Sequence, residues 1–239
     1  RRQCESCLAD ANTDIRKQLV PMSNVNRPIK KYILWDNDGV LVDTEWWYFK
    51  ATQRALAELG VVLEEQTYLE RMVLGKSSWD LAAAMGVDTN LVSVKRQHRD
   101  TYYQAYLAHE NIDIPGVERV LTSLSKTYKM AIVTTSRRTD FELIHKNRGL
   151  VRFMDFVLTR EDYIASKPDP EPYLLALSRF GARAKECLVI EDSQRGLQSA
   201  ISAGIDCAIV YNKFTSNQNF TGARLLLDSI GELTRVIDA

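Results

Sequence analysis

Residues 31–41 of the chain are KYILWDNDGVL, and this stretch decides the fold. The run from Lys31 to Asp36 is short, apolar and ends on a carboxylate, which predicts a buried strand. The Asp36-Asn37-Asp38-Gly39 segment that follows is a common turn sequence, so on its own it does not predict chemistry. This strand is the first element of the predicted fold, and its two aspartates are the first candidate site residues.

Similar apolar runs recur along the chain and alternate with helical patterns. The further predicted strands are 130–134, 187–191 and 207–210, with weaker ones at 156–159 and 223–227. The predicted helices are 117–126, 140–148, 170–180 and 195–203. Gly181 and Gly204 follow the last two helices, where a C-cap glycine is expected. Strands that alternate with helices predict an α/β fold with a doubly wound, Rossmann-like parallel sheet covered on both faces.

One long segment breaks this alternation. Residues 46–112 contain helical periodicity and no convincing strand, with one apolar stripe that includes Trp47, Ala51 and Ala55. We therefore expect an all-helical cap domain over 46–112, inserted into an α/β core domain formed by 31–45 and 113–239. Residues 1–30 are predicted to be an N-terminal extension.

Composition excludes several classes of function. The 239 residues include 31 acidic and 31 basic ones, which argues against bulk binding of nucleic acid or of an anionic membrane. No apolar run approaches the roughly 20 residues that span a bilayer. Residues 1–30 contain no apolar signal-peptide core, so a cytoplasmic monomer is the default expectation. Cys4 and Cys7 form a C-x-x-C pair that lacks a second pair to complete a zinc site.

Polar residues follow four of the predicted strands or lie in the loops after them. They are Asp36 and Asp38, Thr134 and Thr135, Lys167, and Glu191 with Asp192. In open parallel α/β sheets, ligands bind beyond the carboxyl ends of the strands, so we expect these side chains to meet at one edge. Each residue has an ordinary alternative, because strand-end hydroxyls, loop lysines and helix-capping aspartates are common. Their joint occurrence, in order and at strand ends, favours a catalytic site.

The residue types in this set point to phosphoryl transfer. Crowded carboxylates repel one another and need a cation, and oxygen ligands beside a phosphate favour Mg²⁺. Asp36 could attack phosphorus while Asp38 protonates the leaving oxygen and later activates water. Lys167 and the Thr134 hydroxyl could meet the charge of the phosphoryl group.

Four segments resemble the motifs of the haloacid dehalogenase-like phosphatase superfamily: WDNDGVLVDTE, VTTS, SKPDPEPY and VIEDSQRGLQSAISAG. Within it, the chain is most similar to the helical-cap branch, which includes phosphoglycolate phosphatases and β-phosphoglucomutase. The resemblance implies that Asp36 is the nucleophile and Asp38 the general acid/base, whereas dehalogenase members lack this second aspartate. It also implies that Mg²⁺ is held by Asp36, the main-chain carbonyl of Asp38, Asp192 and Glu191. Thr134, Thr135 and Lys167 would bind the phosphoryl group.

The resemblance places substrate specificity in the cap. Lys76, in the loop Leu74–Ser78, and Arg71 are the candidates for contact with a small phosphorylated metabolite, either a sugar phosphate or an organic-acid phosphate. Many relatives have a histidine near the cap hinge where this chain has Tyr48. In mutase relatives this histidine helps to position the acid/base, so Tyr48 argues against a mutase. His98, His109 and His145 lack metal-ligand spacing and are predicted to be surface or packing residues.

Three other functions compete with the phosphatase. A β-phosphoglucomutase-like sugar phosphomutase would use the same residues but return the phosphoryl group to a sugar. A response-regulator-like receiver also has an aspartate cluster, a threonine and a lysine on a doubly wound sheet, but receivers lack a helical insertion. A non-catalytic binding protein is disfavoured because each motif position holds a chemically competent residue.

Overall fold

The computed structural model describes residues 29–237. Most of the predicted extension, and the Cys4/Cys7 pair with it, lies outside this range. The described residues form two compact units. One combines the segment that ends at Val42 with the segment that starts at Asp113, and the other is Asp43–Ile112. The predicted cap, 46–112, falls inside the second unit.

The first unit contains one six-stranded parallel sheet with the strand order β3-β2-β1-β4-β5-β6. Its strands are β1 (Tyr32–Trp35), β2 (Lys129–Val133), β3 (Phe156–Leu158), β4 (Cys187–Glu191), β5 (Asp206–Val210) and β6 (Leu225–Leu227). The prediction of a doubly wound parallel sheet is confirmed. The strand order reverses between β1 and β4, which places the topological switch point of the fold beside β1.

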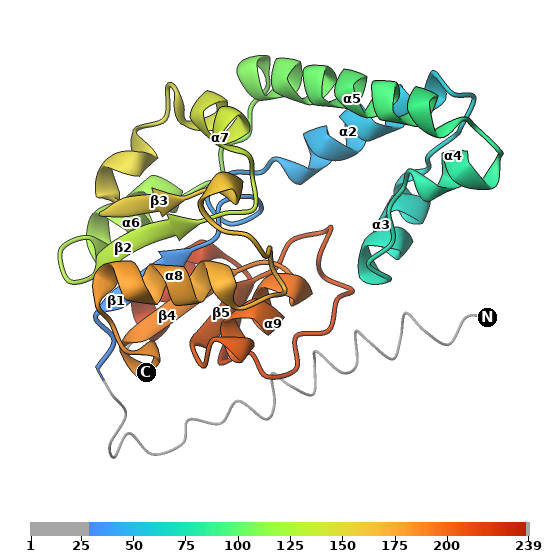
Figure 1. Cartoon of the computed structure of the whole chain (residues 1–239). Coiled ribbons are helices and arrows are strands. Elements are labelled where there is room, and N and C mark those ends of the chain that lie inside the picture. The colour runs from blue at the N-terminus through green and yellow to red at the C-terminus, as the bar shows by residue number, and fades with distance from the viewer. Residues whose placement is uncertain (1–28, 238–239) are drawn as a thin grey trace. The chain divides into compact units, whose positions relative to one another are not determined.

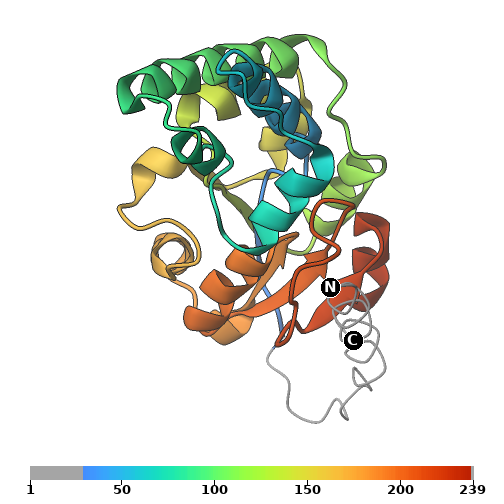
Figure 2. The same cartoon turned by 90° about the vertical axis from the view of Figure 1, so that its right-hand side faces the viewer.

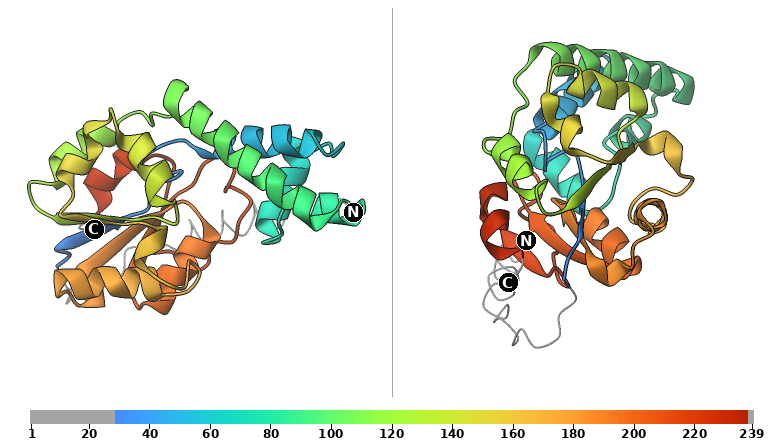
Figure 3. Two further views of the ribbon diagram at one scale, coloured as in Figure 1. Left: turned by 45° about the horizontal axis from the view of Figure 1, so that its top comes forward. Right: turned by 90° about the vertical axis from the view of Figure 1, so that its left-hand side faces the viewer.

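Helices cover both faces of this sheet (Figure 1; Figure 3). Alternate residues of β1 enter different cores. Ile33 and Trp35 join the cluster that includes residues of α6 (Val117–Leu124). Leu34 joins the cluster that includes residues of α8 (Glu171–Phe180) and α9 (Gln194–Ser202). Burial on both faces explains why the strands are continuous apolar runs instead of alternating patterns. The helices are α6 (Val117–Leu124), α7 (Arg138–His145), α8 (Glu171–Phe180), α9 (Gln194–Ser202) and α10 (Leu233–Val236).

Short 3-10 turns complete this unit at η1 (Gly149–Phe153), η2 (Arg160–Asp162), η3 (Ala184–Glu186) and η4 (Ile230–Glu232). Helix α8 ends at Gly181, whose φ of 61° is left-handed, as predicted for a C-cap glycine.

The second unit is built from helices, and its described residues contain no strand. Its helices are α2 (Glu45–Ala57), α3 (Glu65–Val73), α4 (Asp80–Ala84) and α5 (Thr89–His109). Helices α2 and α5 pack side by side through aromatic pairs, with ring centroids 5.3 Å apart for Trp47 and Tyr106 (Figure 2). The predicted all-helical cap is confirmed. Among the described residues, no helix combines the length and the apolar character required to cross a bilayer.

Candidate active site

The sheet brings the predicted residues of three strands to one edge. Asp36 directly follows β1, Thr134 directly follows β2, and Glu191 is the last residue of β4. Strand β1 lies between the other two in the sheet. The Asp36 amide donates to the carbonyl of Ile190 at 2.9 Å, so Asp36 and Glu191 continue adjacent strands at the same level. The expectation that parallel strands gather these side chains is therefore met at the switch point.

Lys167 ties two of the carboxylates together. Its Nζ lies 2.7 Å from Asp36 Oδ1, 2.7 Å from Glu191 Oε1 and 2.8 Å from the carbonyl oxygen of Val133. The Lys167 side chain is 2% exposed, so this ion triad is shielded from water. All three hydrogen atoms of the ammonium have an acceptor, which fixes the side chain between β1, β2 and β4.

The mutual effects of these charges appear in their pKa values. Burial raises the pKa of the Asp36 carboxyl above its ordinary value, Glu191 raises it further, and Lys167 opposes both. Burial alone would lower the pKa of Lys167, but the two carboxylates outweigh burial and raise it. Burial alone would likewise raise the pKa of Glu191, and the Lys167 ammonium instead holds it below its ordinary value. The charges of the other two groups, as well as burial, thus set the pKa of each member of the triad.

Asp192 adds a third carboxylate to this site. Ligand oxygens of Asp36, Glu191 and Asp192 lie within 4.8 Å of one another. The Lys167 ammonium donates to two of these carboxylates, those of Asp36 and Glu191. Clustered carboxylates supply the all-oxygen donor set that a hard divalent cation prefers. The residues present therefore fit Mg²⁺.

Both carboxylate oxygens of Glu191 accept hydrogen bonds from the protein. Its Oε1 accepts from Lys167 and from the Tyr173 hydroxyl, the latter at 2.8 Å. Its Oε2 accepts from the Ser193 hydroxyl at 3.1 Å and from the Asp192 amide at 3.3 Å. Asp192 Oδ2 accepts from the Asn212 side chain at 3.0 Å. Asp192 is thus held by a side chain of the loop after β5. Glu191 is held by a tyrosine of α8 and by the serine that caps α9.

Asp38 lies in the same loop as Asp36 but has different partners. Its Oδ2 accepts from the hydroxyls of Ser136 and Thr134, at 2.6 and 3.2 Å, and from the Asn37 amide at 3.3 Å. Two hydroxyls that follow β2 thereby orient this carboxylate. Asp36 accepts a hydrogen bond from an ammonium, whereas Asp38 accepts from two hydroxyls and an amide. Two carboxylates in such different environments can have different roles in one reaction.

Glycine allows two backbone segments to approach the carboxylates closely. Gly39 has a φ of 84°, and a Cβ added there would lie 2.1 Å from Asp192 Oδ2. A Cβ added at Gly196 would lie 1.9 Å from the carboxyl carbon of Glu191. Any larger residue at either position would displace a carboxylate of the site.

Among the residues that hold this site, the sequence did not single out Ser136, Tyr163, Tyr173 and Asn212. Tyr173 is part of the apolar pattern of α8, so its hydroxyl contact with Glu191 has no sequence signal. The Tyr163 hydroxyl donates to the Thr134 carbonyl at 2.7 Å, also without such a signal. Ser136 ends the Thr134-Thr135-Ser136 run, and this short polar run was the one available indication.

Thr135, predicted to bind substrate, lies at the same edge of the sheet. Its hydroxyl is 3.5 Å from a guanidinium nitrogen of Arg195, in the first turn of α9. Arg195 also contributes to the low pKa of Glu191 through its charge. The guanidinium is exposed and adds a cation close to the predicted phosphoryl-binding residues.

Of the predicted specificity residues of the cap, Arg71 lies in the last turn of α3 and Lys76 in the loop that follows this helix. Arg71 donates to the Ser77 carbonyl and lies 2.8 Å from Asp80, so it shapes the loop that carries Lys76. Lys76 is exposed. Tyr48, at the position of the hinge histidine, accepts a hydrogen bond from Arg99, whose guanidinium lies 4.5 Å from the tyrosine ring centroid.

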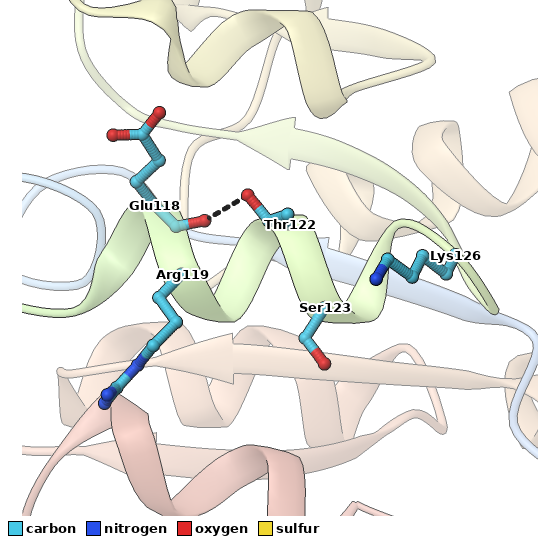
Figure 4. A pocket seen from close by; sticks show the side chains of 5 residues that line it. All are labelled: Glu118, Arg119, Thr122, Ser123 and Lys126. Carbon is cyan, nitrogen blue, oxygen red and sulfur yellow. Dashed lines mark hydrogen bonds between the residues drawn. The ribbon is translucent and has the colours of Figure 1, made fainter.

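A surface depression of the core unit lies apart from all of these residues. It is lined by residues of α6 and the turn after it: Glu118, Arg119, Thr122, Ser123 and Lys126 (Figure 4). The Thr122 hydroxyl is used within the helix, where it donates to the Glu118 carbonyl at 2.8 Å. None of the predicted site residues lines this depression, which therefore adds nothing to the carboxylate site.

The comparisons with known proteins agree with the fold. The sequence model for haloacid dehalogenase-like hydrolase matches residues 33–210. The chain therefore belongs to the haloacid dehalogenase-like hydrolase family. The matched segment includes every predicted residue of the carboxylate site.

Two curated relatives are phosphatases by name. The chain is 32% identical over 182 residues to a phosphorylated carbohydrates phosphatase of Thermotoga maritima, covering 73% of this chain and 82% of the relative. It is 30% identical over 214 residues to an N-acetylmuramic acid 6-phosphate phosphatase of Pseudomonas aeruginosa, covering 87% and 95%. The crystal structure of CbbY from Rhodobacter sphaeroides in complex with phosphate has the same fold, with a TM-score of 0.72, 24% identity, and coverage of 86% and 96%.

Proposed function

We propose that this chain is a magnesium-dependent phosphatase of small phosphorylated metabolites that carries the phosphoryl group transiently on Asp36. The observation that carries the proposal is the buried triad of Asp36, Lys167 and Glu191 with Asp192 beside it. This group combines a proposed nucleophile, a fixed ammonium and three clustered carboxylates at the switch point of the sheet. Membership of a hydrolase family and the phosphatase names of the relatives support the same class.

The first half-reaction transfers the phosphoryl group to the protein. An Asp36 oxygen forms a bond to phosphorus while the bond from phosphorus to the leaving oxygen breaks. Asp38, in its acid form, gives its proton to that leaving oxygen, and the alcohol departs. Lys167 holds Asp36 in place. The Thr134 hydroxyl, which donates to Asp38 in this structure, would turn to a phosphoryl oxygen when substrate binds.

The second half-reaction returns the protein to its starting state. The Asp38 carboxylate takes a proton from water as the water oxygen bonds to phosphorus and the Asp36–phosphorus bond breaks. Inorganic phosphate leaves, and Asp38 again carries the proton that the next cycle needs. One residue thus serves as acid and then as base.

We assign the cation to Asp36, Asp192 and the main-chain carbonyl of Asp38, with Glu191 contributing next to them. Glu191 already accepts hydrogen bonds at both oxygens, so its first task is to hold Lys167 and the start of α9. Bound Mg²⁺ would supply the positive charge that offsets these carboxylates and the incoming phosphoryl group.

We infer that the substrate is a phosphorylated sugar or a related organic-acid phosphate. The named relatives act on phosphorylated carbohydrates and on N-acetylmuramic acid 6-phosphate, both small metabolites. Lys76 and Arg71 remain the proposed cap contacts to the leaving group. Hydrolysis is favoured over a phosphomutase because these relatives are named phosphatases.

The test is phosphate release from a panel of phosphorylated sugars and organic acids, with Mg²⁺ and then with excess chelator. We expect release with Mg²⁺, loss to background with chelator, and recovery when Mg²⁺ is restored. An undiminished rate in excess chelator would contradict the metal assignment. With a hexose 1-phosphate, faster formation of the isomeric sugar phosphate than of free phosphate would support the mutase instead.

Replacing Gly39 by alanine should separate backbone strain from damage to the site. The left-handed backbone at Gly39 costs about 1–2 kcal/mol for a residue with a Cβ. The new Cβ would also push Asp192 by on the order of 1 Å, which can reduce turnover by about 100-fold. Gly181→Ala is the matched control, because Gly181 has a φ of 61° and nothing within 4 Å of the added Cβ.

Urea unfolding and phosphate release should be measured for both variants. We expect a similar loss of unfolding free energy in each and a large loss of turnover only in Gly39→Ala. Equal turnover in the two variants would show that the approach of Gly39 to Asp192 does not matter for the reaction.

A further inference from the structure

A buried histidine of α7 contacts the loop that contains both predicted catalytic aspartates. His145, the last residue of α7, is 9% exposed, and Asn37, between Asp36 and Asp38, is fully buried. His145 Nε2 lies 2.7 Å from Asn37 Oδ1. Phe141 packs on the imidazole with ring centroids 4.4 Å apart. This polar pair inside the core has no role in the reaction described above.

The hydrogen bonds of Asn37 determine which atoms face each other. Its Nδ2 donates to Asp38 Oδ2, so the amide NH₂ faces the carboxylate and the amide oxygen faces His145. An amide oxygen only accepts, and Nε2 of His145 must therefore carry the proton in this contact. Nδ1 of His145 is buried and has no hydrogen-bond partner among the described residues.

The imidazole is neutral in this position. Burial lowers the pKa of His145 to about 4, although the nearby Asp38 carboxylate acts in the opposite direction. A neutral imidazole with Nε2 protonated is a donor toward Asn37 that does not change over the neutral pH range. The contact is therefore a fixed support.

The support matters because an asparagine amide can rotate. Turned by half a revolution, Asn37 would present its carbonyl oxygen to the Asp38 carboxylate and its NH₂ group to the N–H of His145. The contact with Asp38 would then be repulsive, and the Nε2–H donor of His145 would lose its acceptor. With Nε2 protonated, His145 thus favours the amide orientation that donates to Asp38.

We propose that His145 is a positioning residue for the acid/base: it fixes the Asn37 amide, and the amide holds the Asp38 carboxylate in the direction required for proton transfer. This inference rests on the proposed function, in which Asp38 protonates the leaving oxygen and later deprotonates water. His145 neither gains nor loses a proton in either half-reaction. Thr134 and Ser136 hold the same oxygen from the β2 side, so His145 and Asn37 provide the support from the side of α7.

The consequence depends on the leaving group. A nitrophenyl phosphate releases its phenolate without a proton, so its first half-reaction does not need the acid. Its second half-reaction still needs Asp38 as the base. Loss of the support should therefore slow hydrolysis of phospho-Asp36 more than its formation, and the phosphorylated protein should accumulate.

The test compares H145Q with H145M in the full chain, with p-nitrophenyl phosphate and Mg²⁺. Glutamine and methionine have similar lengths, but only glutamine keeps an N–H donor for Asn37. We expect kcat of H145M to fall by about 10–100-fold, the usual effect of losing an outer support of an active site. KM should fall with kcat, because formation of phospho-Asp36 is less affected than its hydrolysis. H145Q should be at least ~5-fold faster than H145M, and acid-quenched H145M should contain a larger phosphorylated fraction than the wild type.

A second removal of the contact keeps the inference testable if H145M does not fold. Asn37→Leu deletes the amide itself and should give the same loss of kcat and the same accumulation. Equal kcat values for H145Q and H145M, or an Asn37→Leu variant as fast as the wild type, would overturn the inference while leaving the phosphatase intact. Absence of phosphate release and of phospho-Asp36 in the wild type would instead overturn the proposed function.

Discussion

Replacing Asp36 by asparagine is expected to lower the rate of phosphate release by at least ~10³-fold. The amide cannot attack phosphorus, and no neighbouring carboxylate can replace it. Glu191 accepts protein hydrogen bonds at both oxygens, and Asp192 is held by Asn212. The measurement is kcat on the best substrate of the panel, combined with acid quenching and peptide mapping of the phosphorylated residue.

Asp228→Asn is the matched control for this substitution. Asp228 is an exposed aspartate of the same unit, and its carboxylate accepts from the Tyr211 hydroxyl at 3.0 Å. The control should keep the turnover of the wild type. Phosphate release by Asp36→Asn within about tenfold of the wild type, or a phosphoryl group mapped to another residue, would refute the nucleophile assignment.

The parallel sheet explains why the sequence predicts so much of this fold. A strand buried on both faces is a continuous apolar run, and Cys187–Glu191 is such a run without alternation. Each predicted strand has a counterpart in the structure, displaced by at most two residues at either end. Because parallel strands place their carboxyl ends at one edge, the meeting of Asp36, Thr134 and Glu191 follows from topology.

The residues that support the site could not be predicted in the same way. Whether Tyr173 directs its hydroxyl to Glu191 depends on the rotation of α8, which the apolar pattern fixes only approximately. Asn212 reaches Asp192 through the conformation of a loop that has no periodicity. His145 was predicted to be a surface or packing residue, and only its distance to Asn37 reveals the polar contact.

Replacing Lys167 by methionine is expected to remove both activity and much of the stability. Methionine matches the length of the lysine stem but leaves Asp36 and Glu191 side by side without their shared ammonium. Loss of one partner from a buried ion group costs roughly 3–5 kcal/mol of unfolding free energy. Turnover should fall by at least ~10³-fold, because the nucleophile loses the group that positions it.

The stability deficit of Lys167→Met should depend on pH and on Mg²⁺. Without the ammonium, the pKa of Asp36 and that of Glu191 in the folded state would both lie above their unfolded values. A carboxyl whose pKa is higher in the folded state destabilises the fold as the pH rises from its unfolded to its folded pKa. The loss of unfolding free energy in Lys167→Met should therefore be smaller at acid than at alkaline pH. Added Mg²⁺ should reduce it by binding to the folded state.

Lys30→Met is the control that separates the site from the loss of a buried lysine in general. Lys30 is 6% exposed and donates to Asp206 and to the carbonyls of Lys185 and Cys187. Cys187 is the first residue of β4, so Lys30 lies at the amino ends of the strands, opposite the site. Asp206 keeps a second partner in Arg224, so we expect a smaller loss of unfolding free energy than for Lys167→Met and full turnover. If the two variants lost activity equally, the triad of Asp36, Lys167 and Glu191 would be a structural support of the sheet and the catalytic assignment would be wrong.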